Sequence, residues 1–195
     1  MRARRRSHNR RSGRWDLLRG ESVTLRTALE SDLECLYAAH TDVASRGRFF
    51  PMGVMSESAF RREFAENGFW QREEGMLLMV NQDDDLVGHI EFFKPVNYWD
   101  AFELSYQLYG GQFAGRGYTT QAVQLLSDYL FATKKQNRIQ LVIVPGNDAS
   151  RRIAEKCGFT LEGTARGAFW NDGRSNDVQI YSLLREDRRP WHPQA

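Results

Sequence analysis

The sequence predicts one α/β domain in which helices flank a mixed, mostly antiparallel central sheet. Its length, 195 residues, suits a single domain with a hydrophobic core of ordinary size. Hydrophobic residues make up 41% of the chain and charged residues 27%, the balance of a soluble globular protein. Strand-like and helix-like segments follow one another without an internal repeat or a dividing linker, which is typical of an α/β domain.

The first half of the chain contains a strand, two helices and a hairpin. Residues 22–27 (SVTLRT) alternate as a half-buried strand does. An acidic start and an apolar face predict a helix over residues 30–39, and a second helix is expected over residues 56–71. Residues 76–80 and 86–93 are apolar runs joined by a polar turn, which predicts a β-hairpin.

The second half of the chain alternates strands and helices around a glycine-bearing loop. A strand over residues 101–109 leads into this loop at residues 110–117, and an amphipathic helix follows to about Thr133. The remaining predicted elements are a buried strand at 139–144, a short helix at 148–156, and closing strands at 159–169 and 178–184.

The formal net charge of +2 conceals an uneven distribution of charge along the chain. Residues 1–14 hold seven arginines and no acidic residue, so the rest of the chain carries 20 basic and 25 acidic residues. We predict a disordered arginine-rich tail over 1–14, a folded domain over 15–187 and a C-terminal tail over 188–195. The arginine-rich tail is either a solvated extension or a basic arm that contacts the ribosome or another polyanion.

Several function classes are disfavoured by what the sequence lacks. No apolar run approaches the ~20 residues of a membrane-spanning helix, and none follows the basic N-terminus as in a secretory signal. Cys35 and Cys157 lie far apart without the spacing of a metal site. We therefore expect a cytoplasmic protein, monomer or homodimer, that has no disulfide, no metal and no membrane contact.

The most informative stretch is the glycine-bearing loop, because a strand runs into it and a helix leaves it. The start of a helix has unpaired backbone N–H groups and partial positive charge. Gly115 and Gly117 lack the β-carbons that would hold an anion away from these groups, and Arg116 adds a full charge. The pattern is consistent with a phosphate cradle, although the same glycines occur in simple turns.

Two motifs around this loop resemble those of one enzyme superfamily. Residues 112–117 (QFAGRG) match the Q/R-x-x-G-x-G/A signature of the GCN5-related N-acetyltransferase (GNAT) superfamily. Residues 147–159 (NDASRRIAEKCGF) match its second motif, an N-x-x-S helix followed by E-K-x-G-F. Residues 24–33 resemble the opening of the ribosomal-protein N-terminal (RimJ/RimL-like) branch. The resemblance covers about residues 20–185, so that the predicted domain at 15–187 is an N-acetyltransferase domain.

The resemblance implies acetyl-CoA as the acyl-donor cosubstrate and a defined place for it. The sheet is expected to be splayed between its fourth and fifth strands, 101–109 and 139–144, with the pantetheine arm in the gap. Backbone amides from Phe113 to Thr119 are expected to bind the pyrophosphate. The implied cofactor-binding residues are Tyr106, Gln107, Leu108, Gln112, Phe113, Ala114, Gly115, Arg116, Gly117, Tyr118, Thr119, Asn147 and Ser150.

Transfer of an acetyl group to an amine needs a neutral amine and a proton for the departing thiolate. Glu103 resembles the strand glutamate of the ribosomal-protein branch and is the candidate base. The alternative is that Glu103 is an ordinary surface residue of a half-exposed strand. Many members carry a tyrosine before the E-K pair as general acid, but Ala154 stands there, which leaves the acid unassigned. Ser150 is the candidate, and Asn147 doubles as a helix N-cap. Cys157 is expected to be a packed, inert thiol.

The acceptor site is expected among aromatic and acidic side chains of the loops. The candidate substrate-binding residues are Phe50, His89, Glu91, Tyr98, Trp99 and Trp170. Three functions stay open: acetylation of a protein N-terminal α-amine, acetylation of a small amine such as an antibiotic, polyamine or amino acid, and a non-catalytic acyl-CoA-binding module. An α-amine, with a pKa of about 7.7–8.0, needs little help to lose its proton, whereas a lysine with a pKa of about 10.4 needs a base.

Overall fold

The protein is described by a computed structural model that covers residues 16–44 and 46–188. Eight strands form one sheet in the order β1-β2-β3-β4-β5-β6-β8-β7. The strands are β1 (Asp16–Arg19), β2 (Val23–Arg26), β3 (Gly75–Asn81), β4 (Leu86–Phe93), β5 (Ala101–Leu108), β6 (Arg138–Ile143), β7 (Thr160–Asn171) and β8 (Arg174–Leu184). The helices are α1 (Leu33–Thr41), α2 (Glu57–Asn67), α3 (Tyr118–Thr133) and α4 (Asp148–Lys156), with 3-10 turns at Glu30–Asp32 and Gly111–Phe113.

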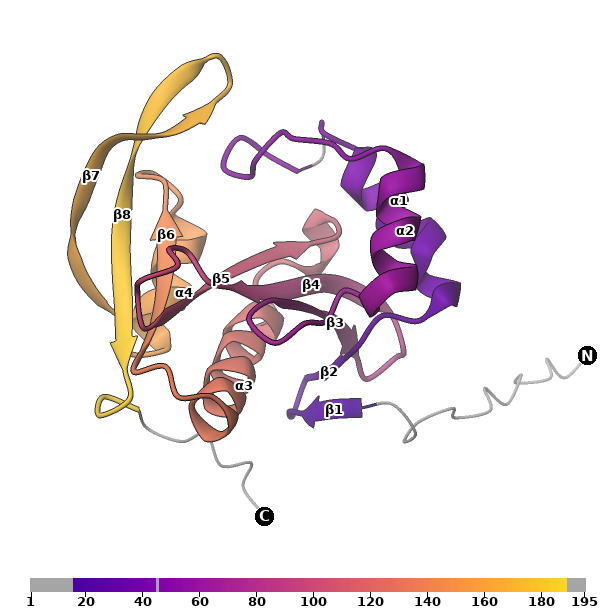
Figure 1. The fold of residues 1–195 in the computed structure, drawn as a ribbon, viewed down its shortest axis with the longest axis horizontal. Coiled ribbons are helices and arrows are strands. Elements are labelled where there is room, and N and C mark those ends of the chain that lie inside the picture. Colours follow the sequence, from indigo (N-terminus) through magenta and orange to yellow (C-terminus); the bar gives the residue numbers. More distant parts are fainter. Residues whose placement is uncertain (1–15, 45, 189–195) are drawn as a thin grey trace, which may run out of the picture.

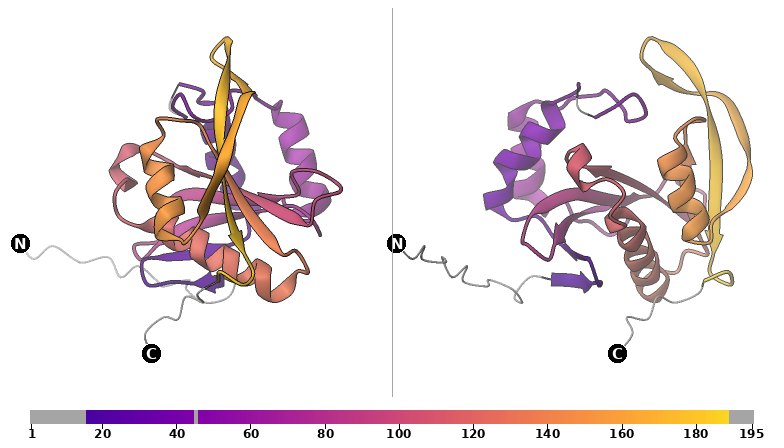
Figure 2. Two further views of the ribbon diagram at one scale, coloured as in Figure 1. Left: turned by 90° about the vertical axis from the view of Figure 1, so that its left-hand side faces the viewer. Right: turned by 180° about the vertical axis from the view of Figure 1, so that it is seen from behind.

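The helices form a layer on each face of the sheet (Figures 1 and 2). Helices α3 and α4 cover one face, where Val123, Leu126 and Ala154 pack against Ile90 and Phe92 of β4 in the larger core cluster. Helices α1 and α2 cover the other face over a smaller cluster that is built around Leu33, Leu36, Phe60, Phe69 and Leu78. The predicted α/β fold with a mixed, mostly antiparallel sheet is confirmed.

The sheet is antiparallel throughout its described strands except where β5 meets β6. These two strands run parallel and pair only over Ala101–Arg138, Phe102–Ile139 and Glu103–Gln140. Beyond Glu103, β5 continues to Leu108 in register with β4, while β6 continues along β8. The strands therefore part, as predicted, and the free edge of β5 offers backbone N–H and C=O groups to a ligand.

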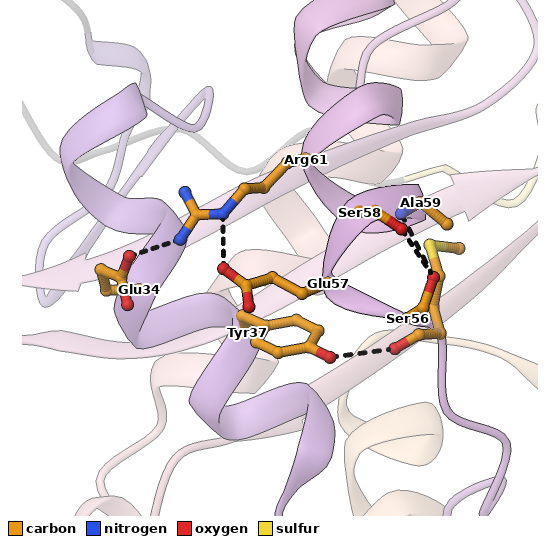
Figure 3. Close-up of polar contacts among 8 residues, drawn as sticks. Glu34, Tyr37, Ser56, Glu57, Ser58, Ala59 and Arg61 are labelled. Atoms are coloured by element: carbon orange, nitrogen blue, oxygen red, sulfur yellow. Dashed lines mark hydrogen bonds and ion pairs between the residues drawn. The ribbon is translucent and has the colours of Figure 1, made fainter.

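Helices α1 and α2 are tied together at the surface, as Figure 3 shows. The Arg61 guanidinium of α2 contacts Glu34 of α1, and its Nε donates to Glu57 Oε1 at 2.8 Å. The Tyr37 hydroxyl donates to the Met55 carbonyl oxygen at 3.4 Å, and Ser56 caps α2 by accepting from the Ala59 amide. These contacts frame one side of the loop between the two helices.

Three parts of the fold differ from the prediction. The edge strand β1 was not expected, because its four residues, DLLR, are too short to show an alternating pattern. Helix α2 ends at Asn67 rather than at Gln71, because Gly68 adopts a left-handed conformation with φ 63°. The closing hairpin is longer than predicted and turns at Asp172 and Gly173, whose φ angles of 52° and 69° suit a two-residue hairpin turn. The predicted tails at 1–14 and, beyond Arg188, at 188–195 lie outside the described residues.

Candidate active site

The glycine-bearing loop connects the free edge of β5 to the start of α3. Gly115 and Gly117 have φ angles of 74° and 83°, a conformation that residues with a side chain rarely adopt. A β-carbon built at either position meets no atom within 4 Å, so the space before the loop is open. The two glycines thus serve the turn itself, and they leave room for an anion beside the helix start.

The backbone amides of this loop divide into two groups. Phe113 and Ala114 donate to the carbonyl oxygens of Gly110 and Gly111 at 3.3 and 3.1 Å within a 3-10 turn. The amides of Phe113 and Ala114 are thus engaged within the turn. Of the predicted cradle at Phe113 to Thr119, the amides from Gly115 onward are the remaining candidates. Helix geometry leaves the first amides of α3, from Tyr118 on, without partners inside the helix. These amides and the helix dipole together favour a phosphate group.

A pocket joins this loop to α4. Its wall is formed by loop and α3 residues between Leu108 and Thr120, and by Ala149, Arg152, Ile153 and Lys156 of α4. Arg152 and Lys156 were not among the predicted site residues, although their spacing of four places them on one face of a helix. Both bring positive charge to the pocket, which suits a polyphosphate ligand. Gln112, in contrast, folds back to donate to the Tyr109 carbonyl oxygen at 3.4 Å.

Asn147 and Ser150 stand at the N-terminus of α4. The Asn147 side chain accepts a hydrogen bond from the Ser150 amide at 3.2 Å, so Asn147 is the N-cap of the helix. The Tyr106 side chain of β5 lies against Ser150. Burial raises the pKa of Tyr106 to about 12, while a side-chain hydrogen bond with Ser150 opposes the rise. Ser150 and a protonated tyrosine hydroxyl therefore lie close together, beyond the point where β5 leaves β6.

Glu103 lies at the last pair before the two strands part. Its Oε2 accepts a hydrogen bond from Gln140 Nε2 of β6 at 2.8 Å. Burial raises the pKa of Glu103, and the hydrogen bond from Gln140 partly offsets the rise. Glu103 lies on the face of β5 that the alternation predicts, since Phe102 and Leu104 lie in the core on the opposite face. Glu103 is thus held against β6.

A cleft opens on the face of the sheet that carries α1 and α2. Its floor contains alternate residues of β4 and β5, which include His89, Glu91, Ser105 and Gln107, and Phe50 lies in its wall. Of the predicted acceptor residues, the structure brings Phe50, His89 and Glu91 together here. Ser105 faces this cleft, while its neighbour Tyr106 faces the α4 side, so the two sites lie on opposite faces of β5.

His89 is buried and fixed by a hydrogen bond. Its Nδ1 lies 2.7 Å from the Tyr109 hydroxyl, and its Nε2 lies 3.6 Å from Glu91 Oε1. Burial, with the charge of Arg46 as a smaller cause, lowers the pKa of His89 to about 4, so the ring is neutral at pH 7. Burial also raises the pKa of Tyr109, which keeps its proton. When that hydroxyl donates to Nδ1, the ring proton is on Nε2 and faces Glu91.

Glu91 is the titratable carboxyl of the cleft. Removal from water, and in second place the charge of Glu74, raise the pKa of Glu91 to about 7. A carboxyl that titrates near neutral pH can accept a proton from an ammonium group at little cost in free energy. The cleft therefore holds a group with the acid–base properties of a general base.

The other predicted acceptor residues lie at the surface. Tyr98, Trp99 and Trp170 are 84%, 40% and 71% exposed, and none of them lines the cleft. Burial raises the pKa of Cys157 to about 12, and its Sγ lies 3.5 Å from the Thr120 carbonyl oxygen, which agrees with a packed thiol.

Two further properties concern the described residues as a whole. No group of three or more His, Cys, Asp or Glu side chains among them is arranged to bind a metal ion. None of the helices in residues 16–44 and 46–188 combines the length and the apolar character that crossing a bilayer requires.

Comparisons with known proteins agree with this architecture. The model of a family described as acetyltransferase (GNAT) domain matches residues 22–160. The putative ribosomal N-acetyltransferase YdaF of Bacillus subtilis is 32% identical over 129 residues, 66% of each chain, so the match spans just under two thirds of that relative. The ribosomal-protein-serine acetyltransferase of Escherichia coli is 26% identical over 170 residues, 84% of this chain and 93% of that protein. A solved structure of RimL, a ribosomal alpha-N-protein acetyltransferase in complex with coenzyme A, is 25% identical at a TM-score of 0.72, and the match covers 85% of this chain and 95% of that one.

Proposed function

Because the chain belongs to the acetyltransferase (GNAT) domain family, we propose that it transfers an acetyl group from acetyl-CoA to a primary amine. One observation carries this proposal: β5 and β6 part directly beside an open glycine loop at a helix start. The parted strands offer an extended slot, and the loop offers backbone amides to a pyrophosphate. RimL, which shares this fold, is recorded in complex with coenzyme A.

The residues present fit acetyl-CoA at both ends of the slot. The amides from Gly115 to the first turn of α3, with Arg152 and Lys156, suit the phosphates. The free edge of β5 at residues 104–108 suits the amide groups of the pantetheine arm. When bound there, acetyl-CoA supplies a thioester carbon that an amine can attack directly.

The acceptor amine belongs in the cleft on the other face of β5. Glu91 lines that cleft and titrates near neutral pH, so it accepts the proton that the amine must lose. Glu103, the base expected from the resemblance, lines none of the described clefts near β5 and is hydrogen-bonded to Gln140. Ser150, with the Tyr106 hydroxyl behind it, is the proton donor for the departing thiolate.

We assign the acceptor to the class of protein N-terminal α-amines. Two relatives support this choice, because the proteins named ribosomal-protein-serine acetyltransferase and RimL ribosomal alpha-N-protein acetyltransferase match this chain over most of its length. The chemistry also supports it, since an α-amine with a pKa near 8 loses its proton to a weak base such as Glu91.

A small cationic amine is the second candidate. A pocket next to the cleft is lined by Glu63, Glu74 and Glu91 together with the aromatic rings of Phe60 and Phe69. Burial raises the pKa of Glu63, and the charges of Glu74 and Glu91 raise it further, so the three carboxyls lie close enough to interact. Carboxylates among aromatic rings suit a polyamine.

Release of free thiol from acetyl-CoA tests both candidates. N-terminal peptides, polyamines, amino acids and lysine-containing peptides with blocked N-termini are assayed as acceptors, with a reaction that lacks acceptor as the blank. We expect the unblocked peptides to give the highest kcat/KM. Release of free thiol with polyamines alone would favour the second candidate. If CoA binds in calorimetry but no acceptor causes release of free thiol, the protein is an acyl-CoA-binding module without catalytic activity.

A further inference from the structure

Arg46 lies in the loop between α1 and α2 and is held from one side. Its Nη1 donates to the carbonyl oxygens of Pro51 and Gly53 at 2.9 and 2.8 Å. Its Cζ lies 5.9 Å from the centroid of the Phe50 ring. The same loop is fastened to the β7–β8 hairpin, because Asn171 Nδ2 donates to the carbonyl oxygens of Arg48 and Phe50. The Arg46 guanidinium is thus fixed in position by backbone groups.

The opposite side of the same guanidinium lacks partners. Nε and Nη2 of Arg46 are buried and donate to no hydrogen-bond acceptor among the residues that the structure describes. These two nitrogens lie on one edge of the planar group and form the fork that binds a carboxylate through two parallel hydrogen bonds. A buried charged donor without a partner costs free energy, which an incoming anion would recover.

The position of this fork relates it to the acceptor cleft. Arg46 and Phe50 line the same cleft as His89 and Glu91, and the Phe50 ring meets the His89 ring edge-on at 6.4 Å. The positive charge of Arg46 contributes to the lowered pKa of His89, in agreement with their closeness. Glu91 lies on the other side of His89, 3.6 Å from its Nε2. The cleft therefore has a basic group and an acidic group, with a neutral imidazole between them.

We propose that Arg46 binds a carboxylate of the acceptor, so that the favoured acceptors carry a negative charge a few bonds from the reactive amine. This inference rests on the proposed acetyltransferase function and refines its substrate class. A free α-amino acid and a peptide with an acidic residue next to its N-terminus both supply such a pair of groups. Because Nε and Nη2 are buried, the carboxylate reaches them only after a local movement of the residues around them.

Matched acceptors that differ in one charge test the proposal. Peptides with Ser-Asp and Ser-Glu N-termini are compared with Ser-Asn and Ser-Gln peptides of otherwise equal sequence. L-Alanine is compared with alaninamide, with kcat/KM calculated per concentration of neutral amine, and O-phosphoethanolamine is compared with ethanolamine. The three kinds of pair separate a peptide side chain, an amino-acid carboxylate and a phosphate as the source of the anion. We expect the anionic member of the preferred pair to have a kcat/KM about 10- to 100-fold higher.

Variants show whether Arg46 is the cause of that preference. Arg46→Gln should reduce the preference to about 3-fold or less while activity toward the uncharged member persists, and Arg46→Lys, which keeps the charge but not the fork, should retain part of it. Arg61→Gln, an arginine on α2 outside the cleft, is the charge-matched control and should leave the ratio unchanged. The ratio compares two acceptors on one variant, so a change in the fraction of active protein cancels from it.

Three outcomes overturn the proposal, and they can be told apart. The proposed role of Arg46 is refuted if the wild-type protein has equal kcat/KM for the anionic and uncharged members, or if Arg46→Gln keeps the full preference. Both results leave the acetyltransferase function standing. Absence of thiol release with every acceptor refutes the acetyltransferase function and, with it, this refinement. If Arg46→Gln fails to fold, the wild-type ratios and Arg46→Lys still decide the question.

Discussion

At the scale of single residues, the cleft proposed for the acceptor contains two side chains of β4, His89 and Glu91, whose pKa values are shifted in opposite directions. His89 is neutral at pH 7 because burial lowers its pKa to about 4. Glu91 loses its proton only near pH 7 because burial raises its pKa to about 7. The two shifts have opposite consequences for stability, because one group binds fewer protons in the folded state and the other binds more.

The pH dependence of unfolding tests these two shifts. Between about pH 4 and 6.5 the unfolded chain protonates His89 and the folded chain does not, so this residue makes stability rise with pH by about 3 kcal/mol in all. Between about pH 4.5 and 7 the folded chain keeps the proton on Glu91, so stability falls as pH rises. In urea titrations, His89→Gln should remove the rising contribution and Glu91→Gln the falling one. The same slope in both variants and wild type would contradict both assignments.

The identity of the base is a second prediction at this scale. If Glu91 accepts the amine proton, Glu91→Gln should lower kcat/KM by about 100-fold and remove the rise of activity through pH 7. Glu103→Gln keeps the hydrogen-bonding shape next to Gln140 and should have the smaller effect. The measurement is the pH profile of kcat/KM for one peptide acceptor with all three proteins. A larger loss in Glu103→Gln would return the role of base to Glu103.

How far single residues could be predicted depended on whether their roles are local. Asn147 follows from its place before a helix, and the sequence motif indicated both it and Ser150. Alternation along β5 correctly separated Glu103 and Ser105 from Phe102 and Leu104. The Arg46 fork was not predictable, because it depends on which loop carbonyls occupy Nη1 and which nitrogens become buried. Trp170 illustrates the converse, since the sequence could not show that this residue of β7 is exposed and lies outside the cleft.

At the scale of elements, the loop between β5 and α3 combines a turn with the proposed anion site. Gly115 and Gly117 carry positive φ angles, and the space before them is open. The turn could be predicted from the glycines, because few other residues adopt that conformation. The division of its amides could not, because the 3-10 turn at Gly111–Phe113 occupies two of them.

A matched pair of glycine substitutions separates these two roles. Gly117 at the loop and Gly173 at the β7–β8 turn have φ angles of 83° and 69°, and a β-carbon at either meets no atom within 4 Å. Gly117→Ala and Gly173→Ala should each lower stability by about 1 kcal/mol, because alanine is strained at positive φ. Only Gly117→Ala should weaken CoA binding, by about 10-fold or more in calorimetry. Equal Kd values for the two variants would contradict an anion site at the loop.

At the scale of the whole molecule, one sheet with a gap lies between the two proposed sites, which are on opposite faces. Helix α3 and the larger core hold β5 on one side of the gap, and β8 holds β6 on the other. The order of elements from β2 to β8 was predictable, because most strands and helices show clear periodicity. Edge strand β1 and the length of the β7–β8 hairpin were not, since short or exposed strands lack an apolar pattern.

The claim on which the account depends is that coenzyme A binds in this gap, with its phosphates at the start of α3. Amide chemical shifts of the labelled protein, recorded by NMR as CoA is added, test it directly. The largest shifts should occur at residues 115–119 and along β5 at residues 104–108, with smaller ones on the α1–α2 side. Unchanged amides at residues 115–119 in the presence of saturating CoA, or shifts confined to another surface, would contradict the account.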